Sequence, residues 1–162
     1  MIRFGANVGI NLKALQLLYP AQQQCGIEIN EQAAQQLGEV IPPERVIRGS
    51  TFDFKPQRVW DVMWIKSVLT HVKPAKPPQV CEALYRSTGQ HLLVAEYYNP
   101  TPVEVSYRGH LQRLFKLDFA GDLMAAFLDL CLVDYSLVYR HDPVMPQDDI
   151  TWFLMRKLGV PA

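Results

Sequence analysis

The sequence has little cysteine, and its cysteines are not arranged as in a metal site. The 162 residues include only Cys25, Cys81 and Cys131, which are odd in number, widely spaced and without a Cys-x-x-Cys pair. Zinc sites and disulfide frameworks need closely spaced or paired cysteines, so neither is expected, and no metal is predicted. Reduced thiols in a cytoplasmic protein are the simpler interpretation.

Long apolar runs and a surplus of charge of either sign are also missing. No run approaches the roughly 18 apolar residues needed to cross a bilayer, and no basic start with an apolar stretch after it resembles a signal peptide. Sixteen basic residues balance sixteen acidic ones, whereas general nucleic-acid-binding proteins carry a basic surplus. These absences predict a cytoplasmic protein that acts on a small molecule, with no nucleic-acid or membrane partner.

The composition is that of a folded protein, with 49% hydrophobic and 20% charged residues, and the length predicts one domain over residues 1–162. Strand-like and helix-like segments alternate along the first two thirds. Strands are expected at 1–4, 24–29, 46–49, 59–66 and 91–97, and helices at 10–19, 31–37, 78–87 and 119–127, with Asn30 and Asp118 as N-caps. Alternation predicts βαβ units and a parallel sheet.

The last third breaks this alternation. Residues 99–116 are polar, aromatic and proline-containing without clear periodicity, and a long loop is expected there. Strands at 130–140 and 150–157 follow without an intervening helix, which predicts an antiparallel hairpin added to the sheet. The predicted fold class is therefore α/β: a Rossmann-like, mostly parallel twisted sheet with helices on both faces and a C-terminal antiparallel hairpin, the ending expected of a class I methyltransferase.

A glycine turn joins the first expected strand to the first helix. It reads Gly5-Ala6-Asn7-Val8-Gly9, and glycine lets the backbone approach a ligand in conformations closed to other residues. Glu28 ends the second strand about twenty residues later, where an acidic side chain can accept hydrogen bonds from both ribose hydroxyls. An ordinary turn and a surface glutamate are the alternatives, but the combined spacing favours a nucleoside cofactor site formed by Gly5, Asn7, Gly9 and Glu28.

Asn7 distinguishes between two kinds of cofactor. The dinucleotide fingerprint G-x-G-x-x-G needs glycine at this position, where the backbone meets a pyrophosphate. S-adenosylmethionine has no phosphates and does not need that glycine. The turn therefore favours S-adenosylmethionine over a nicotinamide cofactor.

Two further loops extend the expected cofactor site. Ser50, Thr51 and Phe52 follow the third strand and would lie along the edge of the adenine, although an ordinary turn with a buried Phe52 explains them equally well. Lys66 ends the fourth strand and would line the methionine end together with His71. A structural role for His71, capping the next turn, is the alternative.

Motifs shared with one known family extend over nearly the whole chain. They are FGANVGINLKAL at 4–15, GIEIN at 26–30, GSTFDF at 49–54, AEYYNPTPVE at 95–104 and, most specific, YRGH at 107–110, LFKLDFAG at 114–121 and PQDDITWFL at 146–154. On these motifs the chain resembles the methyltransferases associated with pseudaminic acid biosynthesis. The resemblance implies a class I fold, S-adenosyl-L-methionine as methyl donor and an acceptor among nonulosonic (pseudaminic acid-type) sugars or their precursors, used in bacterial surface glycans.

Two features depart from the family pattern. Family members carry more chain before the glycine loop, so this sequence is expected to be an N-terminally truncated form. They also usually carry an acidic residue where this sequence has Arg3, and a cation there would lie near the ammonium and sulfonium of the donor. The alternative function is therefore a catalytically impaired methyltransferase-like domain that acts as a binding or interaction module, with an exposed apolar face that favours oligomers.

The acceptor is expected beyond the carboxyl ends of the strands, in an insertion at about residues 98–118. The expected acceptor-binding residues are Glu96, Tyr97, Asn99, Tyr107, Arg108, Arg113 and Lys116. The three cations among them would hold the carboxylate or phosphate of an acidic or nucleotide-activated sugar, a solvated basic loop being the alternative. His110, and after it His71, are the candidates for a base that removes the acceptor proton, although positioning roles explain both.

Overall fold

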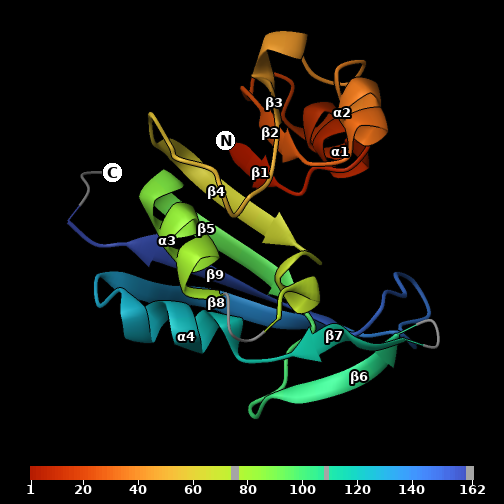
Figure 1. Ribbon diagram of the computed structural model, residues 1–162, viewed down its shortest axis with the longest axis vertical. Helices are drawn as coiled ribbons and strands as arrows, with labels where there is room; N and C mark the ends of the chain where they lie inside the picture. The colour runs from red at the N-terminus through yellow and green to blue at the C-terminus, as the bar shows by residue number, and fades with distance from the viewer. Residues whose placement is uncertain (74–76, 108–109, 160–162) are drawn as a thin grey trace.

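The structure, a computed structural model, describes residues 1–73, 77–107 and 110–159 and is built around a seven-stranded sheet (Figure 1). Its strand order is β3-β2-β1-β4-β5-β9-β8. The parallel part consists of β1 (Ile2–Phe4), β2 (Cys25–Glu28), β3 (Val46–Arg48), β4 (Trp60–Lys66) and β5 (Thr88–Glu96). These strands read as apolar runs because both faces of the sheet are covered there.

Helices pack on both faces of this sheet, as the sequence predicts. Met63 and Ile65 of β4 belong to a core that includes α3 (Pro77–Ser87) and α4 (Phe119–Ala126). Trp64 lies between them in sequence and joins a second core with α1 (Ile10–Leu18) and α2 (Glu31–Leu37). Successive side chains of a strand point to opposite faces, so the two helix pairs lie on opposite sides.

Both predicted helix N-caps are confirmed. The Asn30 side chain accepts a hydrogen bond from the Ala33 amide at 2.9 Å at the start of α2. The Asp118 side chain accepts one from the Gly121 amide at 2.8 Å at the start of α4. Each bond satisfies an amide that has no partner within the first helical turn.

The predicted C-terminal hairpin is confirmed as β8 (Leu130–Val138) and β9 (Ile150–Lys157). β9 inserts between β5 and β8 and runs antiparallel to both. β8 is the edge strand, and apolar side chains are exposed along it: Leu132, Val133, Tyr135 and Leu137. None of the helices among the described residues is long and apolar enough to cross a membrane.

The prediction of one long loop over residues 99–116 is wrong. This segment contains a second, two-stranded antiparallel sheet of β6 (Val103–Tyr107) and β7 (His110–Lys116). Val103 and Val105 alternate with polar residues, which is the period of a strand, but the run is too short to stand out in sequence. The hairpin is joined to the main body by the Thr70 hydroxyl, which donates to the Phe115 carbonyl at 2.7 Å.

Candidate functional site

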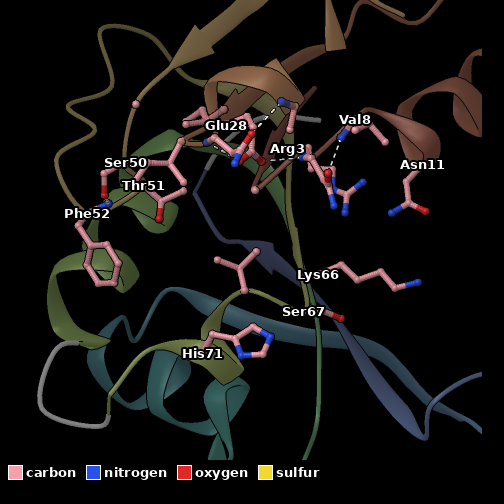
Figure 2. A pocket seen from close by; sticks show the side chains of 18 of the residues that line it. Arg3, Val8, Asn11, Glu28, Ser50, Thr51, Phe52, Lys66, Ser67 and His71 are labelled. Carbon is pink, nitrogen blue, oxygen red and sulfur yellow. Dashed lines mark hydrogen bonds between the residues drawn. The ribbon is translucent and has the colours of Figure 1, made fainter. Parts of the chain in front are cut away.

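A cavity of about 870 Å³ opens at the carboxyl ends of β1, β2, β3 and β4 (Figure 2). Its walls are the glycine turn after β1, the start of α2, the loop after β3 and the loop after β4. The structure brings nearly all of the predicted cofactor residues to this cavity: Gly5, Asn7, Glu28, Ser50, Thr51, Phe52 and Lys66, with His71 beside them. Gly9 does not line it.

The glycine turn is held in a left-handed backbone conformation. Gly5 has a φ of 64° and Asn7 a φ of 51°, and asparagine tolerates this region because its short side chain bonds locally. Here the Asn7 side chain accepts from the Val8 amide at 2.8 Å. Gly9 has a structural role, because a Cβ on it would lie 2.8 Å from the Leu37 side chain of α2.

Glu28 is the last residue of β2, and its side chain is fixed by two backbone amides. One carboxylate oxygen accepts from the Asn7 amide at 2.7 Å and the other from the Asn30 amide at 2.8 Å. The residue is 8% exposed and lines the cavity. An ionised carboxylate has about four acceptor positions, so each oxygen can still accept one further hydrogen bond from a ligand.

The loop after β3 forms the wall on the far side of Glu28. The Ser50 hydroxyl accepts from the Phe52 amide at 3.1 Å and so holds the turn. The Phe52 side chain is 36% exposed and lines the cavity, so the sequence-based alternative of a buried Phe52 is wrong. An aromatic ring in such a position can pack against a flat heterocycle.

The loop after β4 is held in place by a carboxylate beneath it. Glu96, at the end of β5, accepts from the amides of Val68, Leu69 and Thr70 at 2.9, 3.1 and 3.2 Å. These amides begin the single turn η2 (Leu69–His71). Burial raises the pKa of Glu96 to about 7, opposed by the three amide hydrogen bonds.

Glu96 therefore acts on the cavity through this loop. The residue is 2% exposed and is not among the residues that line the cavity, although the sequence suggests an acceptor-binding role for it. The sequence shows only that an acidic residue ends an apolar strand. It does not show which backbone amides Glu96 binds, because that depends on how β5 packs against η2.

Arg3 lies in the cavity wall, in agreement with the expectation that its charge lies near the cofactor site. Its side chain is 5% exposed, and its guanidinium lies 4.8 Å from the centre of the Trp64 ring. With its amide oxygen turned toward Arg3, Asn11 accepts from the two Nη atoms at 2.6 and 2.9 Å. Burial lowers the pKa of Arg3 to about 10, opposed by the Glu28 carboxylate, so Arg3 remains a cation at neutral pH.

Among the expected acceptor residues, the described side chains of Glu96, Tyr97, Asn99 and Lys116 do not line the cavity. Lys116 packs its Nζ 5.4 Å from the centre of the Tyr97 ring, and Asn99 donates to the Thr101 carbonyl at 2.6 Å. Tyr107, His110 and Arg113 are placed on β6 and β7 by their backbone alone, with Tyr107 opposite His110. Arg108 lies outside the described residues. Over the described ranges, no cluster of three or more His, Cys, Asp or Glu residues could hold a metal ion.

Comparison with known proteins supports the same assignment of the fold. No protein-family model and no curated protein sequence matches the chain. Among solved structures, one similar to this chain is 1,6-didemethyltoxoflavin-N1-methyltransferase from Burkholderia thailandensis, with 1,6-didemethyltoxoflavin and S-adenosylhomocysteine bound. The TM-score is 0.73 and the identity 12%, over 96% of this chain and 69% of that one.

Two more solved structures show the same likeness. The DhpI–S-adenosylhomocysteine complex is similar with a TM-score of 0.63 and 16% identity, over 96% of this chain and 75% of that one. A methyltransferase from Mesorhizobium loti that depends on S-adenosylmethionine has a TM-score of 0.67 and 10% identity, over 96% and 89%. With the strand order and the two-faced helix packing, these likenesses show that the chain has the Rossmann-like fold of class I methyltransferases.

Proposed function

We propose that this protein is an S-adenosylmethionine-dependent methyltransferase. The observation that carries the proposal is the Glu28 carboxylate, fixed by the amides of Asn7 and Asn30 at the rim of a cavity between the glycine turn and α2. In a Rossmann-like fold this is where the ribose of a nucleoside cofactor binds. The two oxygens of Glu28 would accept hydrogen bonds from the two ribose hydroxyls.

The rest of the cavity accommodates most of the cofactor. Ser50, Thr51 and Phe52 lie where the adenine would rest, and Lys66 and His71 line the opposite end. When bound, the cofactor supplies a methyl group on a positively charged sulfur. The chain's own part is to exclude water and to hold an acceptor oxygen or nitrogen in line with that methyl group. One group does not fit, because the Arg3 cation lies where the cofactor's ammonium is expected.

The acceptor we propose is a small acidic or nucleotide-activated sugar of the pseudaminic acid type. The support is the family resemblance, together with the position of the β6–β7 hairpin. Thr70 binds the hairpin at Phe115, and the next residue in the chain, His71, lines the cavity. Lys116, and Arg113 by its backbone, thus belong to a segment that packs beside the end of the cavity away from the adenine, where an anionic sugar could reach the methyl group. Arg108 itself is not among the described residues.

Of the two candidate bases, we propose His71. It lines the cavity, whereas the His110 side chain lies outside the part of the chain that the structure describes. An imidazole in this position can take the proton of a hydroxyl or amine as the methyl group is transferred. A His71→Ala variant that keeps full turnover would rule out His71 as the base and leave the proximity of acceptor and methyl group as the source of catalysis.

The alternative, a methyltransferase-like binding module without activity, is favoured by one observation. The buried Arg3 cation in the cavity wall opposes a ligand that itself carries an ammonium and a sulfonium. Weak cofactor binding would follow.

Calorimetric titration with S-adenosylhomocysteine tests the proposed cofactor. We expect saturable binding by the natural chain and a loss of about tenfold to hundredfold in Glu28→Gln, because hydrogen bonds to a charged group are worth about 1.5–3 kcal/mol each. Glu31→Gln is the matched control, since Glu31 is exposed and lies outside the cavity. Absence of binding at millimolar ligand would refute the proposal, and equal losses in both variants would refute the role of Glu28.

Methyl transfer from labelled cofactor to a panel of sugars tests the acceptor. We expect transfer to nonulosonic sugars or their nucleotide-activated forms. Arg108→Ala and Lys116→Ala should raise the acceptor KM by about tenfold, because charge-assisted contacts to an anion are lost. Arg86→Ala, an exposed cation on α3 paired with Glu82, is the control. An unchanged KM in both test variants would remove the anion-binding role of this segment.

A further inference from the structure

The cavity wall contains a buried cation, Arg3, that the Glu28 carboxylate stabilises electrostatically without forming a salt bridge with it. Arg3 takes part in neither of the salt bridges found among the described residues, Arg86–Glu82 and Arg140–Asp149. Its side chain is 95% buried, and its Nε finds no hydrogen-bond acceptor in the part of the chain described. A guanidinium carries five N–H donors, and the single oxygen of Asn11 cannot satisfy them.

A buried charge without an opposite charge is unfavourable unless something pairs with it. Stacking on Trp64 and the contact with Asn11 hold the guanidinium in one orientation but do not neutralise it. The position of Arg3 on β1 faces the same cavity as Gly5 and Asn7. An anionic group of a ligand in the cavity would complete the surroundings of Arg3, because Glu28 forms no salt bridge with it and already accepts from the amides of Asn7 and Asn30.

The charges of the cavity are unevenly distributed. In Figure 2, Arg3, Asn11 and Lys66 lie on one side and Ser50, Thr51 and Phe52 on the other, with Glu28 between them. Lys66 contacts Gln147, which is neutral, at 3.3 Å. If the adenosine lies along Glu28 and Phe52, the tail attached to its sulfur extends toward the two cations.

We propose that Arg3 forms an anion subsite that binds the carboxylate of the cofactor's amino-acid tail, and that the site selects its ligands by negative charge on this tail. The inference rests on the proposed function and concerns the same cavity. A guanidinium pairs with a carboxylate through two parallel hydrogen bonds. The α-amino group of the tail, by contrast, meets a cation of the same sign and gains nothing from this wall.

Four adenosine thioethers test the subsite by calorimetry. They are S-adenosylhomocysteine, its 3-carboxypropyl analogue without the amino group, its 3-aminopropyl analogue without the carboxylate, and 5′-methylthioadenosine, which has no charged tail. For the natural chain we expect the carboxypropyl ligand to bind at least as tightly as S-adenosylhomocysteine. The aminopropyl ligand should bind about tenfold or more weakly than the carboxypropyl ligand, and no better than methylthioadenosine.

Charge variants assign the selection to Arg3. In Arg3→Gln the carboxypropyl and aminopropyl ligands should differ by less than about threefold, and in Arg3→Glu the aminopropyl ligand should bind more tightly. Lys66→Gln removes the other cation and is expected to keep the natural order. The affinity for methylthioadenosine should stay within about threefold throughout, because that ligand does not reach Arg3.

The outcomes separate the two proposals. If the natural chain binds neither S-adenosylhomocysteine nor methylthioadenosine, the proposed cofactor is wrong and the subsite falls with it. If methylthioadenosine binds but the aminopropyl ligand equals or exceeds the carboxypropyl ligand, the subsite alone is overturned. The relative affinities of the natural chain for the carboxypropyl and aminopropyl ligands test the subsite even if Arg3→Glu does not fold. If a folded Arg3→Gln variant keeps the same preference for the carboxypropyl ligand, the assignment of the subsite to Arg3 is overturned.

Discussion

At the scale of single residues, the site depends most tightly on Gly5. Its φ of 64° is unfavourable for residues with a Cβ, and an added Cβ would lie 2.4 Å from the Val68 Cγ2. That separation is shorter than any real contact between carbon atoms, so the loop after β4 would have to move. Gly5 thus lets two walls of the cavity approach each other.

We expect Gly5→Ala to lower the free energy of unfolding by about 1–3 kcal/mol, from backbone strain and overpacking together. Binding of S-adenosylhomocysteine should weaken as well, because Val68 is displaced. Urea unfolding and calorimetry measure the two effects. Gly38→Ala is the control: Gly38 has a φ of −64° at the end of α2, which alanine can adopt, and an added Cβ would lie 3.2 Å from the Gln35 carbonyl oxygen, a much milder contact than at Gly5. Equal stabilities of the two variants would show that the turn is free to relax.

Residue roles were predictable from sequence where they depend on local spacing. Glu28 ends a strand next to a glycine turn, and the structure places it in the cavity wall. The Arg3 charge was visible, but its stacking on Trp64 depends on β1 pairing with β4, which lies about sixty residues away along the chain. Long-range pairing of this kind is not encoded in any local pattern.

At the scale of elements, the loop after β4 joins the two halves of the site. Its amides bind Glu96 beneath, and its Thr70 hydroxyl binds the β6–β7 hairpin. Five residues of this segment line the cavity: Lys66, Ser67, Val68, His71 and Val72. The sequence did not predict this hairpin, because two short strands with few apolar residues resemble a polar loop. Its place in the fold is set by packing against η2.

Glu96 makes the stability of this element depend on pH. Its pKa rises from 4.5 to about 7 on folding because the carboxyl is buried. The folded state therefore binds the proton more tightly than the unfolded state. This contribution to stability is fully present below about pH 4.5 and is lost as pH rises to about 7.

Glu96→Gln removes this titration and tests it. The free energy of unfolding of the natural chain, relative to the variant, should fall by a few kcal/mol between pH 4.5 and 7. Urea unfolding at several pH values in this range gives the difference, and subtraction cancels other titrating groups. Glu82→Gln, at an exposed position on α3, is the control for replacing a carboxylate by an amide. A constant difference for Glu96→Gln would show that its carboxyl titrates alike in both states.

At the scale of the whole molecule, the sheet brings together four loops that are far apart in sequence. The alternation of strands and helices in the sequence predicted the parallel part of the sheet. The two successive strands at the end of the chain, β8 and β9, predicted its antiparallel part. The order of the strands across the sheet could not be predicted from local sequence. Periodicity shows which face of a strand is buried but not which strand lies next to it. The insertion of β9 between β5 and β8 is such a case.

Because the cavity joins loops from β1, β2, β3 and β4, a ligand there should stabilise the whole domain against unfolding. Linkage predicts about 2.7 kcal/mol when S-adenosylhomocysteine is present at about one hundred times its Kd. For a chain of this size that corresponds to an increase in Tm of about 5–10 °C.

Scanning calorimetry with and without the ligand measures this shift. Glu28→Gln should show a much smaller increase at the same ligand concentration, and Glu31→Gln should match the natural chain. A large shift in Glu28→Gln would place the ligand elsewhere on the molecule. Tight binding without any shift would mean that the β1–β4 half of the sheet opens separately from the unit that unfolds at Tm. That result would contradict the prediction of a single cooperative domain, which we base on the one continuous sheet that carries both the cavity loops and the β8–β9 hairpin.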